Sequence, residues 1–163
     1  MQLQLPNFTY EKLKKNLELA AEYGATKGTC DRLRVGCIVC SEDGSFLFFG
    51  ANASPLGKPG CDAIGHLMID NHCMRTIHAE QTVVSLAAKE GKSIDGGVAF
   101  VSHTPCLHCA KILINAGIKH IYYRTEYANA ATREQLDNLS NDMGVPIGLL
   151  PKKQTRRNNI KFV

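Results

Sequence analysis

Apolar residues at the start of the chain recur at the spacing of one face of an amphipathic helix. The residues on this face are Tyr10, Leu13, Leu17, Ala20 and Ala21. They are mostly three or four positions apart, which is typical of a helix that packs one side against a core. Because glycine commonly follows the last turn of a helix, we expect this one to end at Gly24.

Farther along, apolar runs and turn residues alternate. Val35–Cys40 and Phe46–Gly50 flank the turn sequence Ser-Glu-Asp-Gly and predict a β-hairpin, and the glycines and prolines of Ala51–Asn71 predict a loop. Strands that alternate with helices after an opening hairpin indicate an α/β protein, with a mixed sheet that carries helices on both faces. The elements expected after the loop are helices over 77–89, 106–116 and 132–141 and strands over 98–102, 118–123 and 146–150.

Composition and charge fit one globular domain followed by a basic tail. The chain has 163 residues, of which 44% are apolar and 21% charged, and this length suits a single domain. Residues 152–163 hold five basic residues and no acid, so removing their charges from the formal net charge of +4 leaves −1. A body so close to neutral argues against a broad nucleic-acid-binding face. The tail is either a solvated terminus or a contact for a subunit or a nucleotide phosphate.

The chain has seven cysteines, a high count and an odd one, so they cannot all be paired in disulfides within the chain. The opening residues, MQLQLPNFTY, lack the basic and apolar regions of a secretory signal, and no apolar run approaches the ~20 residues of a membrane span. We therefore expect a cytoplasmic protein with no membrane partner, whose thiols bind metal rather than form disulfides. Cys37 and Cys40 are exceptions, because on a strand they point to opposite faces and are expected to be core residues.

The clearest chemical motif combines His-Ala-Glu at 78–80 with Pro-Cys-Leu-His-Cys at 105–109. A histidine, a C-x-x-C pair and a glutamate that is not a ligand form the signature of zinc deaminases. We expect Thr104 to cap a helix that starts at Pro105, so that Cys106 and Cys109 share one face of its first turn. Zn²⁺ held by His78, Cys106 and Cys109 would keep a fourth position open for water.

Glu80 is the predicted catalytic residue. Residues two apart do not face each other along a helix, but at the first turn both His78 and Glu80 can project past its end. Glu80 would take a proton from water at the metal and deliver it to a ring nitrogen and to the departing amine. The alternative is a closed structural zinc site, in which His108 is the fourth ligand and Glu80 lies on the helix surface.

At these residues the chain resembles the cytidine deaminase superfamily, and nearly its whole length is similar to deoxycytidylate (dCMP) deaminases of the bacterial and phage type. The resemblance implies a three-layer α/β/α fold with a five-stranded mixed sheet over residues 1–151, and hydrolysis of dCMP to dUMP. It also implies homo-oligomers, commonly hexamers, which dCTP activates and dTTP inhibits at a separate Mg²⁺-dependent nucleotide site. The similar segments are CDRLRVG at 30–36, GANASPLG at 50–57, CDAIGHLMIDNHCMRTIHAEQ at 61–81, TPCLHCAK at 104–111 and AGIKHIYY at 116–123.

The resemblance also assigns two substrate-binding residues. Asn52 would hold the sugar hydroxyl, although its loop reads Ala-Asn-Ala-Ser-Pro where the family has Tyr-Asn-Gly-x-Pro. Lys89 falls where a related enzyme places a phosphate-binding arginine, and a lysine binds phosphate without the fork of arginine. Lys89 is otherwise an ordinary surface lysine. These departures leave both dCMP and dCTP open as substrates.

Some relatives carry a second, structural zinc, with cysteines at the positions of Cys30 and Cys61. A long loop rich in glycine and proline is poorly ordered unless something ties it down. Zn²⁺ bound by Cys30, Cys61, Cys73 and either His66 or His72 would do so. The alternative is a set of reduced, metal-free cysteines, with the histidines serving the nucleotide site.

Two other functions compete with a deaminase of free nucleotides. A deaminase of bases within RNA or DNA, such as the transfer-RNA adenosine enzymes, shares the zinc signature, but the near-neutral body and the cysteine–histidine loop fit it less well. A zinc-stabilised interaction module without catalysis would have no need of Glu80 beside an open zinc position. The sequence therefore favours deamination of a deoxycytidine nucleotide, either dCMP alone or both dCMP and dCTP.

Overall fold

The computed structural model describes residues 8–127 and 130–150, so the basic tail at 152–163 lies outside the described residues. Every helix and strand expected from the sequence is present, with ends shifted by a few residues. Within the described part of the chain, no helix has the length and apolar character needed to cross a membrane. The helices are α1 (Tyr10–Lys27), α2 (Cys61–Ile64), α3 (Ala79–Glu90), α4 (Leu107–Asn115) and α5 (Ala130–Met143). The strands are β1 (Gly36–Cys40), β2 (Phe46–Ala51), β3 (Met68–Ile69), β4 (His72–Cys73), β5 (Val98–His103), β6 (His120–Thr125) and β7 (Ile147–Leu149).

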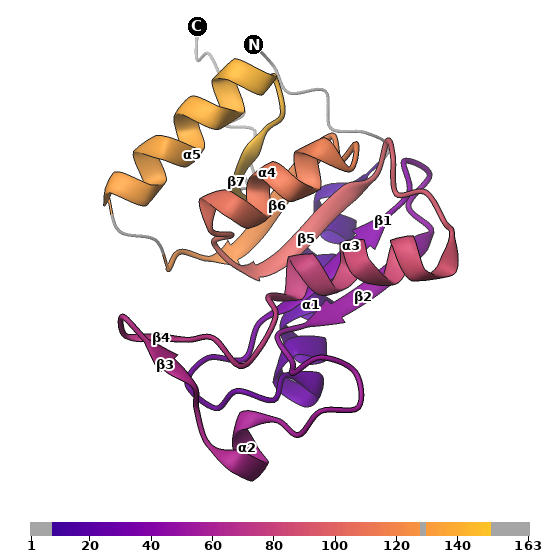
Figure 1. Cartoon of the computed structure of the whole chain (residues 1–163). Coiled ribbons are helices and arrows are strands. Elements are labelled where there is room, and N and C mark those ends of the chain that lie inside the picture. The colour runs from indigo at the N-terminus through magenta and orange to yellow at the C-terminus, as the bar shows by residue number, and fades with distance from the viewer. Residues whose placement is uncertain (1–7, 128–129, 151–163) are drawn as a thin grey trace, which may run out of the picture.

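Five strands form one mixed sheet in the order β2-β1-β5-β6-β7 (Figure 1). The hairpin expected near the start is β1–β2, and β1 is also antiparallel to β5. The strands β5, β6 and β7 are parallel to their neighbours. Parallel strands need a long crossover connection, and α4 and α5 supply the two crossovers.

The sheet separates two apolar cores. On one face α1 contributes Leu13 and Leu17, and on the other face α3, α4 and α5 contribute Val83, Leu113 and Leu136. Figure 1 shows α3 and α4 in front of the sheet and α1 behind it. The expected α/β fold, with a five-stranded mixed sheet between helices, is confirmed.

The cysteines of β1 behave as strand geometry predicts. Cys37 is buried in the core beneath α3 and α4, whereas Cys40 is buried in the core beneath α1. Successive side chains of a strand alternate between faces, so residues three apart lie on opposite sides. All seven cysteines of the chain are free thiols.

The first helix does not end at Gly24, and that prediction was wrong. α1 continues to Lys27, and Gly24 is buried within it. A Cβ on Gly24 would collide with the backbone nitrogen of Gly36, at the start of β1. Glycine is therefore required here because helix and strand approach closely, and not because the helix stops.

We expect Gly24→Ala to destabilise the protein, although alanine is the better helix former. The gain in helix propensity is about 1 kcal/mol, but the added methyl group must push the backbone of β1 aside. Overpacking of this kind costs about 1–3 kcal/mol and occasionally more, so we expect a net loss of up to about 2 kcal/mol in the free energy of unfolding, measured with urea. Gly148→Ala is the control, because a Cβ there meets nothing within 4 Å. Equal unfolding midpoints for the two variants would contradict the close approach.

The segment Ala51–Asn71, expected to be a loop, contains regular structure. α2 forms one turn, and β3 pairs antiparallel with β4 in a small hairpin apart from the main sheet, in the lower part of Figure 1. The two turn residues, Asp70 and Asn71, have φ angles of 46° and 62°, as the central residues of a type I′ turn do. The Asp-Asn pair was the one sequence signal for this turn, since aspartate and asparagine tolerate the left-handed conformation better than most residues.

Candidate active site

Two helix N-termini meet at one place in the fold, and each carries side chains that can bind metal. His78 is the N-cap residue of α3, and Cys106 is the N-cap residue of α4. Cys109, in the first turn of α4, joins them in a group whose ligand atoms all lie within 4.8 Å of one another. The structure thus brings together the three residues that the sequence indicated for the catalytic metal.

The spacing of this group suits zinc. His78 Nδ1 lies 3.3 Å from Cys109 Sγ and 3.7 Å from Cys106 Sγ. In a tetrahedral site with Zn–N bonds of ~2.1 Å and Zn–S bonds of ~2.3 Å, a nitrogen and a sulfur ligand lie ~3.6 Å apart. Both distances from His78 are therefore close to those of a zinc site.

The start of α4 also favours the thiolate form of Cys106. The backbone N–H of Cys109 donates to Cys106 Sγ at 3.5 Å, at the positive end of α4. Hydrogen bonding from the Cys109 thiol lowers the pKa of Cys106 far below its usual range, against the effect of burial. The hydrogen bond with Cys106 raises the pKa of His78.

Thr104 does not cap α4, and that prediction was wrong. The sulfur of Cys106 caps the helix, whose first residue is Leu107. Thr104 instead extends the pairing of β5 with β6, because its backbone N–H donates to the carbonyl oxygen of Thr125 at 2.9 Å. Its hydroxyl accepts a hydrogen bond from the backbone N–H of Tyr127 at 3.0 Å. The sulfur of Cys106 therefore both caps α4 and belongs to the three-ligand group.

Glu80 is buried beside the three-ligand group. It is the second residue of α3, and the residue is 3% exposed. Burial raises the pKa of Glu80 to about 7, against the lowering effects of its own backbone N–H and of His78. His108, the fourth ligand of the alternative closed site, is exposed and is not in the group found among the described residues. The arrangement is one of three ligands with a carboxyl group next to them.

Of the two predicted substrate residues, Asn52 lies in a backbone network and Lys89 lies at the far end of a helix. Asn52 Oδ1 accepts from the backbone N–H of Val35 at 2.7 Å, and its Nδ2 donates to the carbonyl oxygen of Leu33 at 2.6 Å. Lys89 is exposed in the last turn of α3, ~16 Å along the helix from His78. Within one chain the structure does not bring Lys89 to the metal group, and both substrate roles stay predictions.

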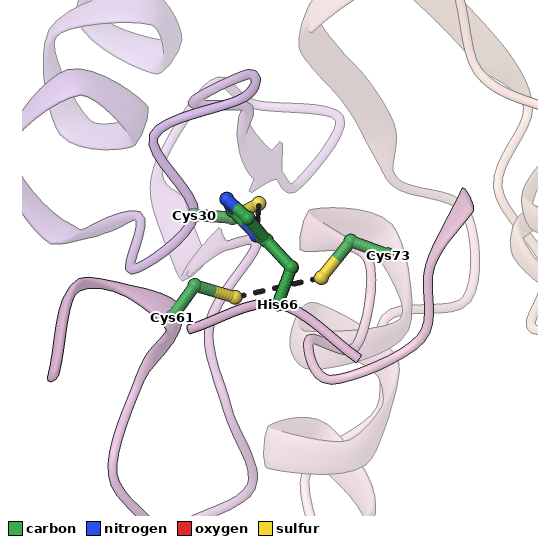
Figure 2. Close-up of side chains that lie close together, drawn as sticks. All are labelled: Cys30, Cys61, His66 and Cys73. Atoms are coloured by element: carbon green, nitrogen blue, oxygen red, sulfur yellow. Dashed lines mark hydrogen bonds between the residues drawn. The ribbon is translucent and has the colours of Figure 1, made fainter. Parts of the chain in front are cut away.

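A second group of potential metal ligands comes from two parts of the chain. One member precedes β1, and the other three lie between β2 and α3. Its members are Cys30, Cys61, His66 and Cys73, here called the loop cluster, and Figure 2 shows their side chains converging. The four ligand atoms lie within 4.8 Å of one another. His72 is exposed, and the clusters found among the described residues do not contain it.

The loop cluster also has the dimensions of a zinc site. Cys61 Sγ lies 3.5 Å from Cys73 Sγ, and Cys30 Sγ lies 3.7 Å from His66 Nδ1. The corresponding edges of a tetrahedral zinc site are ~3.8 Å between two sulfurs and ~3.6 Å between sulfur and nitrogen. Although burial acts in the opposite direction, hydrogen bonds from the backbone of Arg75 and the side chain of His66 lower the pKa of Cys73 to about 6.

This fold and these sites define a class of protein. A three-layer α/β/α domain with a His-x-Glu helix start beside a Pro-Cys-x-x-Cys helix start has the architecture and motif of the zinc deaminases. The family model described as the cytidine and deoxycytidylate deaminase zinc-binding region matches residues 10–125. The chain belongs to this family.

The chain is similar in sequence to deoxycytidylate deaminases and to one other protein. It is 40% identical to ComE operon protein 2 of Bacillus subtilis (strain 168) over 112 residues, which cover 69% of this chain and 59% of that protein. It is 32% identical to the deoxycytidylate deaminase of enterobacteria phage T4 over 83 residues, 51% of this chain and 42% of that protein. The chain thus spans about half the length of these two relatives.

A solved structure matches this chain over a larger part of its own length than these two relatives do. The dCMP deaminase of the cyanophage S-TIM5, crystallised in complex with dCMP and dUMP, has a TM-score of 0.73 and 30% sequence identity to this chain. The match covers 88% of this chain and 99% of the cyanophage chain. The apo form of that enzyme gives a TM-score of 0.66, so the fold is that of a deaminase.

Proposed function

We propose that this chain is a zinc-dependent deoxycytidylate deaminase that converts dCMP and water to dUMP and ammonia. The observation that carries the proposal is the buried carboxyl group of Glu80 beside the three-ligand group of His78, Cys106 and Cys109. The similarity to a cyanophage dCMP deaminase whose structure contains dCMP and dUMP supports the choice of substrate.

The three ligands and Glu80 have separate tasks in this reaction. A zinc ion held by His78 Nδ1 and the two sulfurs would supply a Lewis acid that lowers the pKa of water from 15.7 to about 7. Glu80 takes the proton that water releases and passes it to ring nitrogen N3 of cytosine as oxygen bonds to C4. It then takes the second proton from the oxygen now bonded to C4 and gives it to the amine, so that the carbonyl group at C4 forms, the C–N bond breaks and ammonia leaves.

The substrate is tested by ammonia release from dCMP, dCTP, deoxycytidine, cytidine and adenosine, each with and without dTTP and Mg²⁺. We expect dCMP to be turned over fastest and dTTP with Mg²⁺ to inhibit. Equal turnover of dCTP and dCMP would instead make the chain a dual deaminase. Activity confined to free nucleosides would overturn the nucleotide substrate, and absence of an effect of dTTP would overturn the proposed regulation.

We propose a structural Zn²⁺ for the loop cluster, bound by Cys30, Cys61, His66 and Cys73. Four protein ligands fill a tetrahedral site, so this metal would stabilise the loop rather than take part in the reaction. The distances within the cluster support the proposal. We therefore expect about two zinc ions per chain by elemental analysis, and only one would contradict it.

We further propose a homo-oligomer, a hexamer by resemblance, that binds dCTP and dTTP with Mg²⁺ at a site apart from the catalytic group. Apolar side chains exposed on the segment before α3 support an interface between subunits. Leu56 is 76% exposed, Met74 58% and Ile69 54%. Light scattering of the purified chain with and without each nucleotide measures the assembly, and a monomer under all conditions would contradict it.

A further inference from the structure

His66 differs from the other members of the loop cluster because its ring offers two nitrogens to a metal. Nδ1 faces Cys30 Sγ at 3.7 Å, while Nε2 lies 3.1 Å from Asp31 Oδ1. A neutral imidazole carries one hydrogen, and the nitrogen that lacks it is the one able to bind metal. With Nδ1 directed at the cysteines, the hydrogen belongs on Nε2, where the carboxylate of Asp31 accepts it.

The chain brings Asp31 to this position for a local reason. Asp31 follows Cys30 directly in the turn between α1 and β1, so one turn supplies both a sulfur ligand and the carboxylate. The backbone N–H of Thr29 donates to the carbonyl oxygen of Asn52 at 3.0 Å, before the pair. After it, Arg32 donates to the carbonyl oxygen of Asn71 at 3.2 Å. The turn is therefore held on both sides of Asp31.

We propose that Asp31 is a positioning residue for the metal of the loop cluster, on the premise of the second zinc proposed above. Its carboxylate accepts the hydrogen bond of His66 Nε2–H, fixes the ring tautomer and holds Nδ1 toward the three sulfurs. A carboxylate on the far nitrogen also makes the imidazole a stronger ligand. The cluster is thus a five-residue unit of four ligands and one orienting acid.

The expected loss of metal affinity on removal of the Asp31 carboxylate depends on how exposed the hydrogen bond is to water. Loss of such an outer partner typically weakens metal binding 10–100-fold. The side chain of Asp31 is 67% exposed and that of His66 27% exposed, so water competes for the hydrogen bond and screens the charge. We therefore expect a change near the lower limit, about tenfold.

The test uses the full chain loaded with two equivalents of Zn²⁺, and separately with ¹¹³Cd²⁺. Competition with a chelator gives a dissociation constant for each metal, and ¹¹³Cd resonances assign the two, because a site of three sulfurs and one nitrogen differs from one of two sulfurs and one nitrogen. Asp31→Ala should weaken the loop-cluster metal about tenfold and leave the catalytic metal unchanged. Asp31→Asn, which keeps an oxygen acceptor, should weaken it less.

A second readout separates positioning from general loss of structure. In ¹⁵N-edited NMR of the zinc-loaded chain, the Nε2–H of His66 should exchange with water faster in Asp31→Ala than in the unaltered chain. Asp137→Ala is the matched control, because Asp137 pairs with Arg133 on α5 and should change neither metal. Unchanged loop-cluster affinity in Asp31→Ala would overturn the positioning role.

The outcomes also separate the role of Asp31 from the proposed second zinc and from the proposed deaminase activity. An unaltered chain that binds a single metal would overturn the second zinc and the role of Asp31 together. A chain that binds two metals but releases no ammonia from any substrate would overturn the proposed deaminase activity. In that case the metal affinity of Asp31→Ala still decides the role of Asp31.

Discussion

Glu80→Gln is expected to lose nearly all deamination of dCMP while it keeps the fold and both metals. Glutamine has nearly the same volume but cannot take up and release a proton. General acid–base groups contribute ~10²–10⁴-fold to a rate, so we expect kcat to fall about 10³-fold. The fold should tolerate the change because Glu80 is only 3% exposed, and burial at this position disfavours a charge.

The measurements for this variant are steady-state ammonia release, zinc content and thermal unfolding. Glu90→Gln serves as the control, since Glu90 ends the same helix and pairs with Lys92 in solvent. The control should match the unaltered chain in all three measurements. Near-normal turnover by Glu80→Gln would show that another group moves the protons.

Cys61→Ser is expected to release the loop-cluster metal and loosen the segment before α3. A neutral hydroxyl replaces a thiolate in a site where the free energy of metal binding also stabilises the fold. Zinc content should fall from about two ions per chain to about one. Backbone amides of residues 56–76 should then exchange with deuterium faster than in the unaltered chain.

The same substitution should also lower activity, because hydrogen bonds of the backbone and of the Thr29 hydroxyl connect the cluster to the start of α3. The N–H of Asp62 donates to the carbonyl oxygen of Thr29 at 3.3 Å. The hydroxyl of Thr29 accepts from the N–H of Ser54 at 3.1 Å. The carbonyl oxygen of Ala53 accepts from the N–H of Ile77 at 3.0 Å, immediately before His78. Loss of order at Cys61 therefore reaches the residue that opens α3.

We expect kcat/KM for dCMP to fall about tenfold in Cys61→Ser, the lower end of the range for residues that orient a metal ligand. Cys40→Ala is the control, because Cys40 is a buried cysteine outside both ligand groups of the described residues. It should keep both metals and its activity. Retention of two metals by Cys61→Ser would contradict the proposed ligand set.

Local patterns determined much of the site. The C-x-x-C spacing places Cys106 and Cys109 one helical turn apart wherever the helix begins, and His-x-Glu places His78 and Glu80 at the start of another. Strand alternation likewise separated Cys37 from Cys40. These inferences needed only the repeat of one helix or one strand, which is why they did not depend on the rest of the fold.

The choice between His66 and His72 needed the tertiary structure. In the β3–β4 hairpin, His72 and Cys73 are consecutive residues of one strand, so their side chains point to opposite faces. Because the side chain of Cys73 faces the other members of the loop cluster, that of His72 is directed away from them. The histidine of the cluster is His66, on the preceding segment. The sequence pattern did not predict this hairpin, and the two histidines stayed equivalent without it.

Two further features depend on contacts between segments far apart in the chain. The sequence by itself determined the α/β class, the order of the main helices and strands, and the His-x-Glu and Cys-x-x-Cys pairs, because each follows from spacing along one element. Only the tertiary structure decided that Gly24 serves a helix–strand crossing rather than a helix end, and that Asp31 lies on the far nitrogen of His66. The physical reason is that a side chain's partner across the fold is set by packing and pairing, which local periodicity does not contain.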